Sequence, residues 1–458
     1  MLTRIEIDGF KTFEGFHLDL RPFVVILGPN ASGKSNLFDA IRLLSRLADA
    51  DLRTAVKEMR GEPTELFRRK PDGDYGTRMS FAVEVLLEPE VRDPWGALFK
   101  VKHSRVRYEV EIERRRDERG IERLVVTREQ ALPILRKDDR WKQKRSRVFN
   151  SAFIKSSRQN PWLTTEVAEE SVSFKISQDG HQGRTRPAEA AEATVLSSIG
   201  SVEFPHLYAL RAEMRSWRFL QLDPAALRDP SPIFAAEELE PDGKNLATVL
   251  ARIQAETATR ERPKGALADI AADLAALIPG VVGLSVGEDQ ERRNYRIDVE
   301  LRDGPPFSAR VISDGTLRVL ALLTILHDPR HRSLVCFEEP ENGVHPLRLK
   351  TLIQRARELV TDAAGEDVDP LEPLTQLLVN SHSPVVLSSL NLGEGEAMFA
   401  DTVSAVGGHL GAEANGRTVR RTRIRPILLD EPLFVQPENE VTRLEVINYL
   451  SSVQLPEA

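Results

Sequence analysis

Residues 28–35 read GPNASGKS and fit the phosphate-binding pattern G-x-x-x-x-G-K-S/T without a departure. A glycine loop of this kind can wrap a phosphate with backbone N–H groups, and the helix that follows adds the positive end of its dipole. Lys34 would reach the β- and γ-phosphates of a nucleotide, and Ser35 would hold Mg²⁺. The alternative is a plain glycine turn with a solvated Lys34. The residues expected to contact the nucleotide are Gly28, Asn30, Ala31, Ser32, Gly33, Lys34, Ser35 and Asn36.

Two carboxylates later in the chain are the second chemical feature. Glu338 and Glu339 follow the apolar run 334–337, which predicts a buried strand that ends in acidic side chains. Ligand sites in parallel α/β sheets lie at that end of the strands. Because neighbouring residues of a strand point to opposite sides, one carboxylate can bind the hydration shell of a magnesium ion while the other activates an attacking water. The alternative is a solvated acidic turn.

Two further segments place a polar side chain where it can contact phosphate. The apolar run 374–379 predicts another strand, and His382 follows it, where the imidazole can hydrogen-bond a γ-phosphate or the attacking water. Ser313 and Gly315 begin a predicted helix and can hold an anion at its N-terminus. Each has a structural alternative, since a lone histidine is usually structural and Ser313 can be an ordinary N-cap.

The elements that must position these residues follow from the apolar pattern. The β-branched run 23–27 predicts a buried strand before the glycine loop, and apolar residues at helical spacing after Ser35 predict a helix. Alternation or apolar runs predict further strands in residues 3–8, 16–20, 79–88, 106–113, 121–127, 281–286, 295–301, 397–406 and 418–427. Helical spacing predicts further helices in residues 245–256, 266–278 and 347–360.

Taken together, these segments resemble the core of ABC-type P-loop ATPases, specifically the AAA_21 predicted-ATPase branch related to RecF-like and OLD-family proteins. The opening residues 3–13, a strand followed by Gly-Phe-Lys-Thr-Phe, look like the start of RecF-like and chromosome-maintenance ATPases. The resemblance covers residues 1–45 and 205–400 well, and residues 46–204 loosely. It implies an α/β fold, with a P-loop NTPase core, an antiparallel β lobe and an inserted segment.

The resemblance also implies a role for each motif. Residues 28–35 would be Walker A, and residues 313–316 the signature loop. Glu338 would belong to Walker B and bind the metal, and Glu339 would be the catalytic glutamate. His382 would be the switch histidine.

The chain departs from the family pattern at several positions. Residues 312–316 keep only the serine and the second glycine of the signature Leu-Ser-Gly-Gly-Gln, and Glu338 stands where an aspartate is usual. Residues 341–345 fall in the D-loop region, whereas a Q-loop glutamine is not evident. We expect these departures to affect the contact between the signature loop and the nucleotide of a second subunit, and the rate of ATP hydrolysis, more than nucleotide binding itself.

In this superfamily two subunits enclose two ATP molecules, with the signature loop of one facing the P-loop of the other. The resemblance therefore implies ATP and Mg²⁺ as cofactors, slow ATP hydrolysis and an ATP-dependent homodimer. A switch of this kind acts on DNA or on a partner effector such as a nuclease or toxin, for example in prokaryotic anti-phage defence or DNA repair. The alternatives are the ATPase subunit of an OLD-like nuclease system and, less favoured, the ATPase of a membrane transporter.

We expect four parts in the chain. Residues 1–134 would form the N-terminal part of the core with the antiparallel lobe, and residues 135–204 a polar and basic insertion. Residues 205–400 would complete the core, and residues 401–458 would be a small extension. No acidic constellation that would hold two metals follows Pro384, which disfavours a built-in nuclease.

The insertion holds a basic run around Trp141. One interpretation is a nucleic-acid contact in which Trp141 stacks on a base. The favoured alternative is a solvated, flexible loop, because charge runs are usually solvated and Asp138 and Asp139 dilute this one. The basic residues are Arg136, Lys137, Arg140, Lys142, Lys144, Arg145 and Arg147.

Composition narrows the remaining possibilities. The net charge of -7 provides no global basic field, so any nucleic-acid contact needs a local patch. Cys336 is the single cysteine, which excludes an internal disulfide and a cysteine-rich zinc site; we expect it to pack in its strand. No apolar run is long enough to span a bilayer, and the N-terminus does not look like a signal peptide, so we expect a cytoplasmic protein without a membrane partner.

Overall fold

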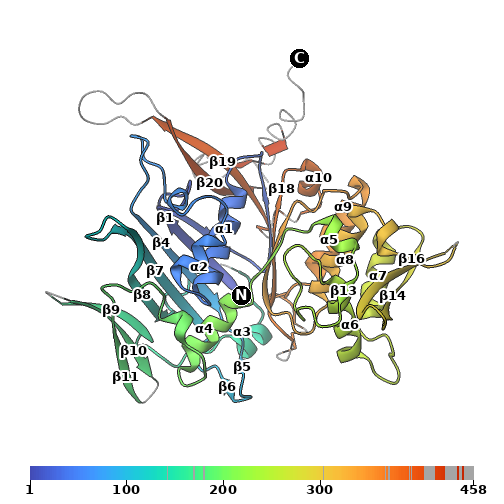
Figure 1. The fold of residues 1–458 in the computed structure, drawn as a ribbon, viewed down its shortest axis with the longest axis horizontal. Coiled ribbons are helices and arrows are strands. Elements are labelled where there is room, and N and C mark those ends of the chain that lie inside the picture. Colours follow the sequence, from blue (N-terminus) through green and yellow to red (C-terminus); the bar gives the residue numbers. More distant parts are fainter. Residues whose placement is uncertain are drawn as a thin grey trace.

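A central sheet lies between two lobes of the molecule (Figure 1). The computed structural model describes residues 1–141, 143–168, 171–178, 181–302, 304–366, 368–369, 372–390, 392, 395–406, 418–428, 441–442 and 446–447. In spatial order, the described strands of the central sheet are β12 (Arg218–Leu220), β17 (Ser333–Glu338), β18 (Thr375–Ser381), β3 (Phe23–Leu27), β19 (Ala397–Val406), β20 (Thr418–Leu428) and β21 (Val441–Thr442). The first five run parallel, whereas β20 is antiparallel to β19.

Alternation along the buried strands of this sheet directs side chains into two separate cores. Val24 and Ile26 of β3 belong to the core of the N-terminal lobe, whereas Val25 and Leu27 belong to the core of the second lobe. A strand buried on both faces is apolar at every position, as β3 is. Cys336 of β17 is fully buried, which confirms the expected packing, and this burial raises the pKa of its thiol well above the usual value.

The N-terminal lobe is built on an antiparallel sheet. Its described strands, in spatial order, are β11 (His181–Pro187), β10 (Ser171–Gln178), β9 (Leu163–Ala168), β8 (Glu122–Pro133), β7 (Arg105–Arg116), β4 (Arg78–Leu86), β1 (Leu2–Asp8) and β2 (Phe16–Asp19). The helices α1 (Lys34–Leu47), α2 (Leu52–Lys57) and α4 (Pro205–Arg215) cover one face of this sheet (Figure 1). Residues 90–92 and 98–100 pair as the short strands β5 and β6. The predicted α/β class with an antiparallel lobe is confirmed.

The second lobe is mainly helical. Its helices are α5 (Pro224–Arg228), α6 (Leu246–Thr257), α7 (Leu267–Leu277), α8 (Asp314–Leu326), α9 (Pro346–Glu358) and α10 (Pro384–Leu387). A small sheet, formed by β13 (Ser231–Pro232), β15 (Asn294–Leu301), β14 (Val281–Asp289) and β16 (Phe307–Ser308), borders them. Almost every residue of α8 is buried, because α6, α7 and α9 pack around it. This packing fixes the start of α8, where the predicted signature loop lies.

The segment 135–204, predicted as a polar and basic insertion, contains regular elements after its basic run. The helix α3 (Arg147–Phe153) and the strands β9, β10 and β11 lie within it, and these strands extend the antiparallel sheet. In β10 Phe174 and Ile176 are buried, while their neighbours are polar. With Val172 the strand β10 does alternate, whereas the sequence of β11, HQGRTRP, has no apolar alternation, so its pairing depends on tertiary context. Lys142 lies outside the described residues.

Candidate nucleotide site

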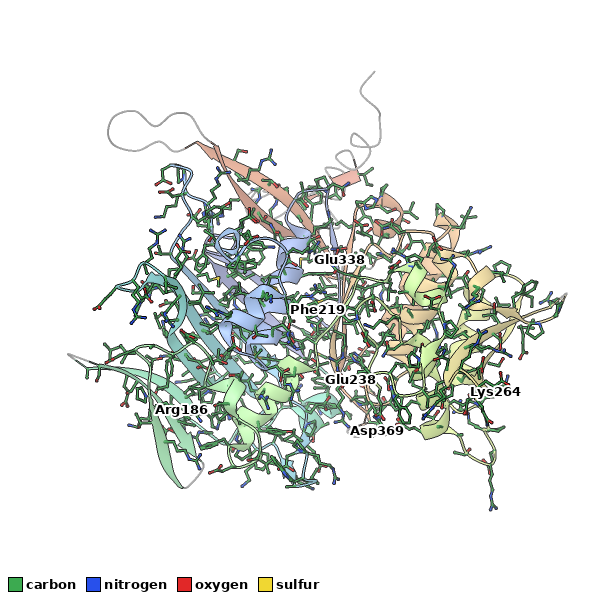
Figure 2. All side chains as sticks on the ribbon, in the orientation of Figure 1. Arg186, Phe219, Glu238, Lys264, Glu338 and Asp369 are labelled. Carbon is green, nitrogen blue, oxygen red and sulfur yellow. The ribbon has the colours of Figure 1, made fainter. Side chains whose placement is uncertain are left out.

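The parallel strands bring the three predicted catalytic segments to one edge of the central sheet. In the register of β18 with β3, Ser381 stands beside Leu27, so His382 and Gly28 leave the sheet together. In the register of β17 with β18, Glu338 stands beside Asn380. Figure 2 shows Glu338 in the middle of the molecule, above Phe219 of β12 on the same sheet. The glycine loop, the acidic pair and the histidine therefore meet at the carboxyl ends of neighbouring strands.

The loop 28–35 has the conformation of a phosphate cradle. Ala31 and Gly33 have positive φ angles of 62° and 95°, which turn the chain sharply before α1 begins at Lys34. The Lys34 Nζ atom donates to the carbonyl oxygens of Gly28 and Pro29, at 2.7 Å each. Ser32 Oγ is buried and finds no hydrogen-bond partner within the described residues. These groups fit a phosphate, which would offer oxygen acceptors to both side chains.

The charge on Lys34 depends on its acidic neighbours. Burial lowers the pKa of its ammonium group to about 8, while Glu339, Glu341 and Glu338 act in the opposite direction. All three carboxylates are therefore close enough to stabilise the ammonium charge. This cluster links Walker A to Walker B within one chain.

The strands β19 and β20 brace the loop. A Cβ atom on Gly28 would lie 2.4 Å from the carbonyl oxygen of Ala400, and one on Gly33 would lie 1.9 Å from Thr422 Oγ1. No side chain fits at either position without displacing these groups, so close approach requires glycine at both, and the positive φ of 95° adds a second reason at Gly33. Thr422 was not singled out from the sequence, and no local pattern identifies it.

Thr12 joins this brace to the first turn of the chain. Its hydroxyl lies 2.7 Å from Thr422 Oγ1, and its carbonyl oxygen accepts a hydrogen bond from the Thr422 amide at 3.0 Å. The same hydroxyl accepts from Asn36 Nδ2 at 2.9 Å. Asn36, expected to contact the nucleotide, thus has a structural partner for its amide group. Asn30 and Ala31 are exposed at the tip of the loop.

Glu338 and Glu339 contact different partners, but not through the strand alternation that was predicted, because β17 ends at Glu338. The Glu338 Oε1 atom lies 3.3 Å from Arg60 Nη2, and the Nε atom of Arg60 lies 3.4 Å from Asp39 Oδ1. Glu339 has a positive φ of 52°, and its amide donates to the carbonyl and side-chain oxygens of Asn380, at 3.0 and 3.1 Å. Non-glycine residues with positive φ are uncommon and concentrate at functional sites.

A third carboxylate, Glu341, holds the histidine in place. Its Oε1 atom accepts from Ser381 Oγ at 2.8 Å and from the His382 amide at 2.9 Å. The His382 Nδ1 atom lies 3.1 Å from the same oxygen and 3.9 Å from Glu339 Oε1. Asn342 donates its side-chain amide to Glu339 at 2.7 Å. Sequence reasoning assigned Glu341 only to the D-loop region, and the position of its carboxylate beside the histidine was missed.

The predicted signature loop lies against the D-loop region of the same chain. Ser313 Oγ caps α8 by accepting from the Thr316 amide at 3.3 Å, which is the structural alternative stated for this serine. A hydroxyl has two lone pairs, so the cap leaves capacity for a second partner. A Cβ atom on Gly315 would lie 1.7 Å from the carbonyl oxygen of Gly343, so only glycine fits there. Arg228 donates to the Ile312 carbonyl oxygen at 3.0 Å and pairs with Asp314.

With this geometry in place, comparison with known proteins identifies the family. The family model AAA_21, described as "AAA domain, putative AbiEii toxin, Type IV TA system", matches residues 23–388. The chain belongs to the AAA_21 family. The predicted class, an ABC-type P-loop ATPase, is confirmed; the RecF-like and OLD-like branch stays a prediction.

Individual relatives are more distant. Structural maintenance of chromosomes protein 1 of Schizosaccharomyces pombe is 41% identical over 61 residues, which are 13% of this chain and 5% of that protein. An Smc head bound to the C-terminal winged-helix domain of ScpA aligns with 92% of this chain and 97% of its own, at 13% identity and a TM-score of 0.49. An Smc head with an extended coiled coil, bound to the C-terminal domain of ScpA from Pyrococcus furiosus, aligns with 99% of both chains, at 12% identity and a TM-score of 0.47.

The interpretation of Trp141 as a base-stacking residue is wrong for this AAA_21 protein. The side chain is 6% exposed, and its indole N–H donates to the Leu20 carbonyl oxygen at 3.1 Å. Arg105 and Arg145 stack on its ring, with their guanidinium carbons 5.4 and 5.1 Å from the ring centre. The exposed residues of the basic run are Arg136, Lys137, Arg140, Lys144 and Arg147.

Two further properties concern the residues of this ATPase that the structure describes. None of their helices is long and apolar enough to cross a membrane. They contain no group of three or more histidine, cysteine, aspartate or glutamate residues arranged to hold a metal. A Mg²⁺ ion bound with a nucleotide needs only one or two protein ligands, because phosphate oxygens and waters complete its shell. Ser35 and Glu338 therefore remain suitable ligands.

Proposed function

We propose that this AAA_21 ATPase binds ATP with Mg²⁺ in the loop 28–35 and hydrolyses it slowly. The observation that carries the proposal is the meeting of Lys34, Glu339 and His382 at one sheet edge. Phosphoryl transfer requires positioning and electrostatic stabilisation more than covalent chemistry, so a cation, a water-orienting carboxylate and a histidine suffice. Each of them is fixed by a described contact of its own segment.

The residues divide the work in a defined way. When ATP binds, the Lys34 ammonium group gives up its hydrogen bonds to the carbonyl oxygens of the loop and donates to the β- and γ-phosphates instead. The phosphate oxygens also replace the water that this buried ammonium group has lost. Ser35 and Glu338 are the residues that would hold Mg²⁺, which neutralises phosphate charge when bound. Glu339 orients the attacking water or accepts its proton, and His382, aligned by Glu341, contacts the γ-phosphate.

The active form in this proposal is an ATP-dependent homodimer. The signature loop lies against Gly343 of its own chain, and apolar side chains beside it face solvent: Val311 is 67% exposed and Leu347 is 81% exposed. Exposed apolar residues beside a phosphate-binding helix start suit a surface that a second copy covers. Ser313 and Gly315 of one subunit would then contact the nucleotide of the other.

The biological role proposed for this switch is control of DNA or of a partner effector such as a nuclease or toxin, in anti-phage defence or DNA repair inside the cytoplasm. Two observations support it. The family description names a toxin of a toxin–antitoxin system, and a short segment is similar to a chromosome-maintenance protein. The role itself rests on analogy of the fold and family.

Calorimetry with ATP and Mg²⁺ tests the proposal, followed by measurement of phosphate release from the same sample. We expect saturable binding and slow turnover. A wild-type protein that binds neither ATP nor its non-hydrolysable analogues would overturn the proposed function. Light scattering of the ATP-bound protein tests the dimer separately, because nucleotide binding does not require it.

A further inference from the structure

The strand β20 carries two kinds of residue at alternate positions. Arg421, Arg423 and Arg425 alternate along this strand with Thr422 and Ile424, and all five residues line one groove. Arg421 is exposed, whereas Thr422, Ile424 and Arg425 are largely buried. Side chains at every second position of a strand lie on the same face and repeat at roughly 7 Å. One face of β20 is thus a ladder of guanidinium groups, and the other face packs on the interior.

The groove runs between the edges of the two large sheets. It has a volume of about 590 Å³ and is lined by β2 on one side and by β20 on the other. Figure 1 shows the β19–β20 pair reaching over the N-terminal strands near β1. Arg21, Trp141 and Gln143 also line the groove. The basic run 136–147 therefore borders the arginine ladder, although the two are far apart in the sequence.

The local charge of this groove is positive in a chain whose net charge is -7. Arg423 and Arg425 share one carboxylate, Asp401, at 2.6 and 2.8 Å. Arg21 and Arg421 line the same groove and add two further cations to it. Asp19, the acidic residue of the β2 side, is paired with Arg4 at 2.6 Å. Closely spaced cations in a concave site attract a polyanion.

The buried face of the same strand touches the P-loop. Thr422 contacts Thr12 by two hydrogen bonds, and its side chain occupies the space beside Gly33. A shift of β20 toward or away from the groove therefore moves a wall of the nucleotide loop. The groove and the loop therefore share a single strand, and Thr422 contacts both.

We propose that the groove between β2 and β20 binds the sugar–phosphate backbone of a nucleic acid, and that β20 couples this binding to the nucleotide loop. The proposal rests on the proposed ATP-dependent switch and names its partner and the path between the two sites. Arginine suits phosphate because its planar fork donates two parallel hydrogen bonds. A groove lined by arginines, in which the ring of Trp141 is buried, predicts backbone contact with little sequence preference.

The binding test uses the full chain with short labelled oligonucleotides, read by fluorescence anisotropy over a series of salt concentrations. Single-stranded DNA, duplex DNA and RNA of equal length form separate arms. Arg421→Ser combined with Arg423→Ser is expected to lower the affinity at least tenfold and to reduce the slope of log K against log salt by about 1 for each lost phosphate contact. The matched control is Arg420→Ser combined with Arg260→Ser, both exposed and outside the groove lining.

Several outcomes overturn the binding part. Equal losses in the groove variant and the control would show a general charge effect. Absence of binding in all three arms would exclude a nucleic acid as the ligand. Equal competition by polyglutamate at the same charge concentration would indicate an acidic peptide instead. ATP affinity of the same sample is measured in parallel, so a protein that binds ATP but no oligonucleotide loses this inference while the proposed function stands.

The coupling test uses Thr422→Val, which keeps the side-chain shape and removes the hydroxyl that contacts Thr12. In the wild type, ATP is expected to change oligonucleotide affinity severalfold, and oligonucleotide is expected to change ATP affinity by the same factor, because coupling between two sites is reciprocal. The variant is expected to bind oligonucleotide but to lose that factor. Identical wild-type affinities with and without ATP would overturn the coupling.

Discussion

The loop 28–35 and the loop 312–316 differ in how many of their sides are covered by other parts of the same chain. The first is enclosed by β19, β20 and the turn at Thr12, and Lys34 is buried within it. The second is held on one side by Gly343 and Arg228, while Val311 beside it faces solvent. A preorganised loop can bind its ligand without a partner, whereas a loop supported on one side needs a second surface.

This difference assigns the two steps of the cycle to different assemblies. In the proposed function the first contacts with the nucleotide belong to the single chain, because Lys34, Glu338 and His382 lie at the edge formed by β3, β17 and β18. The same proposal gives closure of the site to a dimer, because the predicted signature loop packs on its own D-loop region at Gly343. Variants that affect one step and spare the other can therefore separate the two regions.

Glu339→Gln is expected to have the largest effect. An amide of the same shape cannot accept the proton of the attacking water, so hydrolysis should fall by roughly 10²–10⁴-fold while ATP still binds. The ATP-bound dimer should then accumulate, and light scattering with ATP and Mg²⁺ measures it. Glu358→Gln, an exposed change on α9, is the control. Wild-type hydrolysis, or a scattering mass equal to that of the ATP-free protein, would mean that Glu339 or the dimer model is the wrong choice.

Lys34→Ala acts on the enclosed loop and is expected to come next in size. Hydrogen bonds to charged groups contribute roughly 1.5–3 kcal/mol each, and each 1.4 kcal/mol is a tenfold change, so ATP affinity should fall by about a hundredfold. Calorimetry gives the affinity directly. Lys57→Ala removes an exposed lysine of α2 and should leave it unchanged. An unchanged affinity in Lys34→Ala would remove the basis for assigning this loop to phosphate.

Ser313→Arg acts on the loop 312–316, which the chain covers on one side only. Bulk and charge at the start of α8 should block approach of a second subunit, so adding this change to Glu339→Gln should abolish the trapped dimer. ATP affinity of the monomer should not change, since Ser313 has its hydrogen bonds with Thr316. Loss of an N-cap costs about 1 kcal/mol of stability, so Ser313→Ala serves as the control for that loss. A dimer that survives in the double variant would separate dimerisation from this loop.

The sequence predicted those parts of the site that are continuous in the chain. The loop 28–35 and the run 334–339 are local patterns, in which a strand is followed at once by its functional residues. Thr12 and Thr422, which brace the loop, are 410 residues apart, and although Thr12 lies in the opening Gly-Phe-Lys-Thr-Phe segment, no sequence pattern links it to Thr422. Their contact depends on the pairing of β19 with β3, which no local pattern encodes.

Trp141 illustrates the same limit within the N-terminal lobe. A tryptophan within a basic run is compatible with either a stacking platform or a buried anchor. The choice is made by distant partners, the Leu20 carbonyl oxygen and the aromatic ring of Phe149, 6.2 Å from its own. Sequence reasoning therefore predicted the charge of this segment and missed its packing.

The smallest expected effect is a pH dependence confined to the enclosed loop. The pKa of Lys34 lies at about 8, below the ordinary value of 10.5, mainly because of burial. Phosphate favours the ammonium form, so the pKa should be higher in the ATP-bound protein than in the free protein. The sign follows by linkage: affinity is fully present below pH 8 and falls by up to tenfold per unit as pH rises above it. Calorimetry between pH 7 and 9 measures the slope, and Lys34→Ala should flatten it. If ATP affinity in Lys34→Ala still falls as pH rises, the titrating group is not Lys34. The comparison of the two loops would then rest on the measurements of dimerisation.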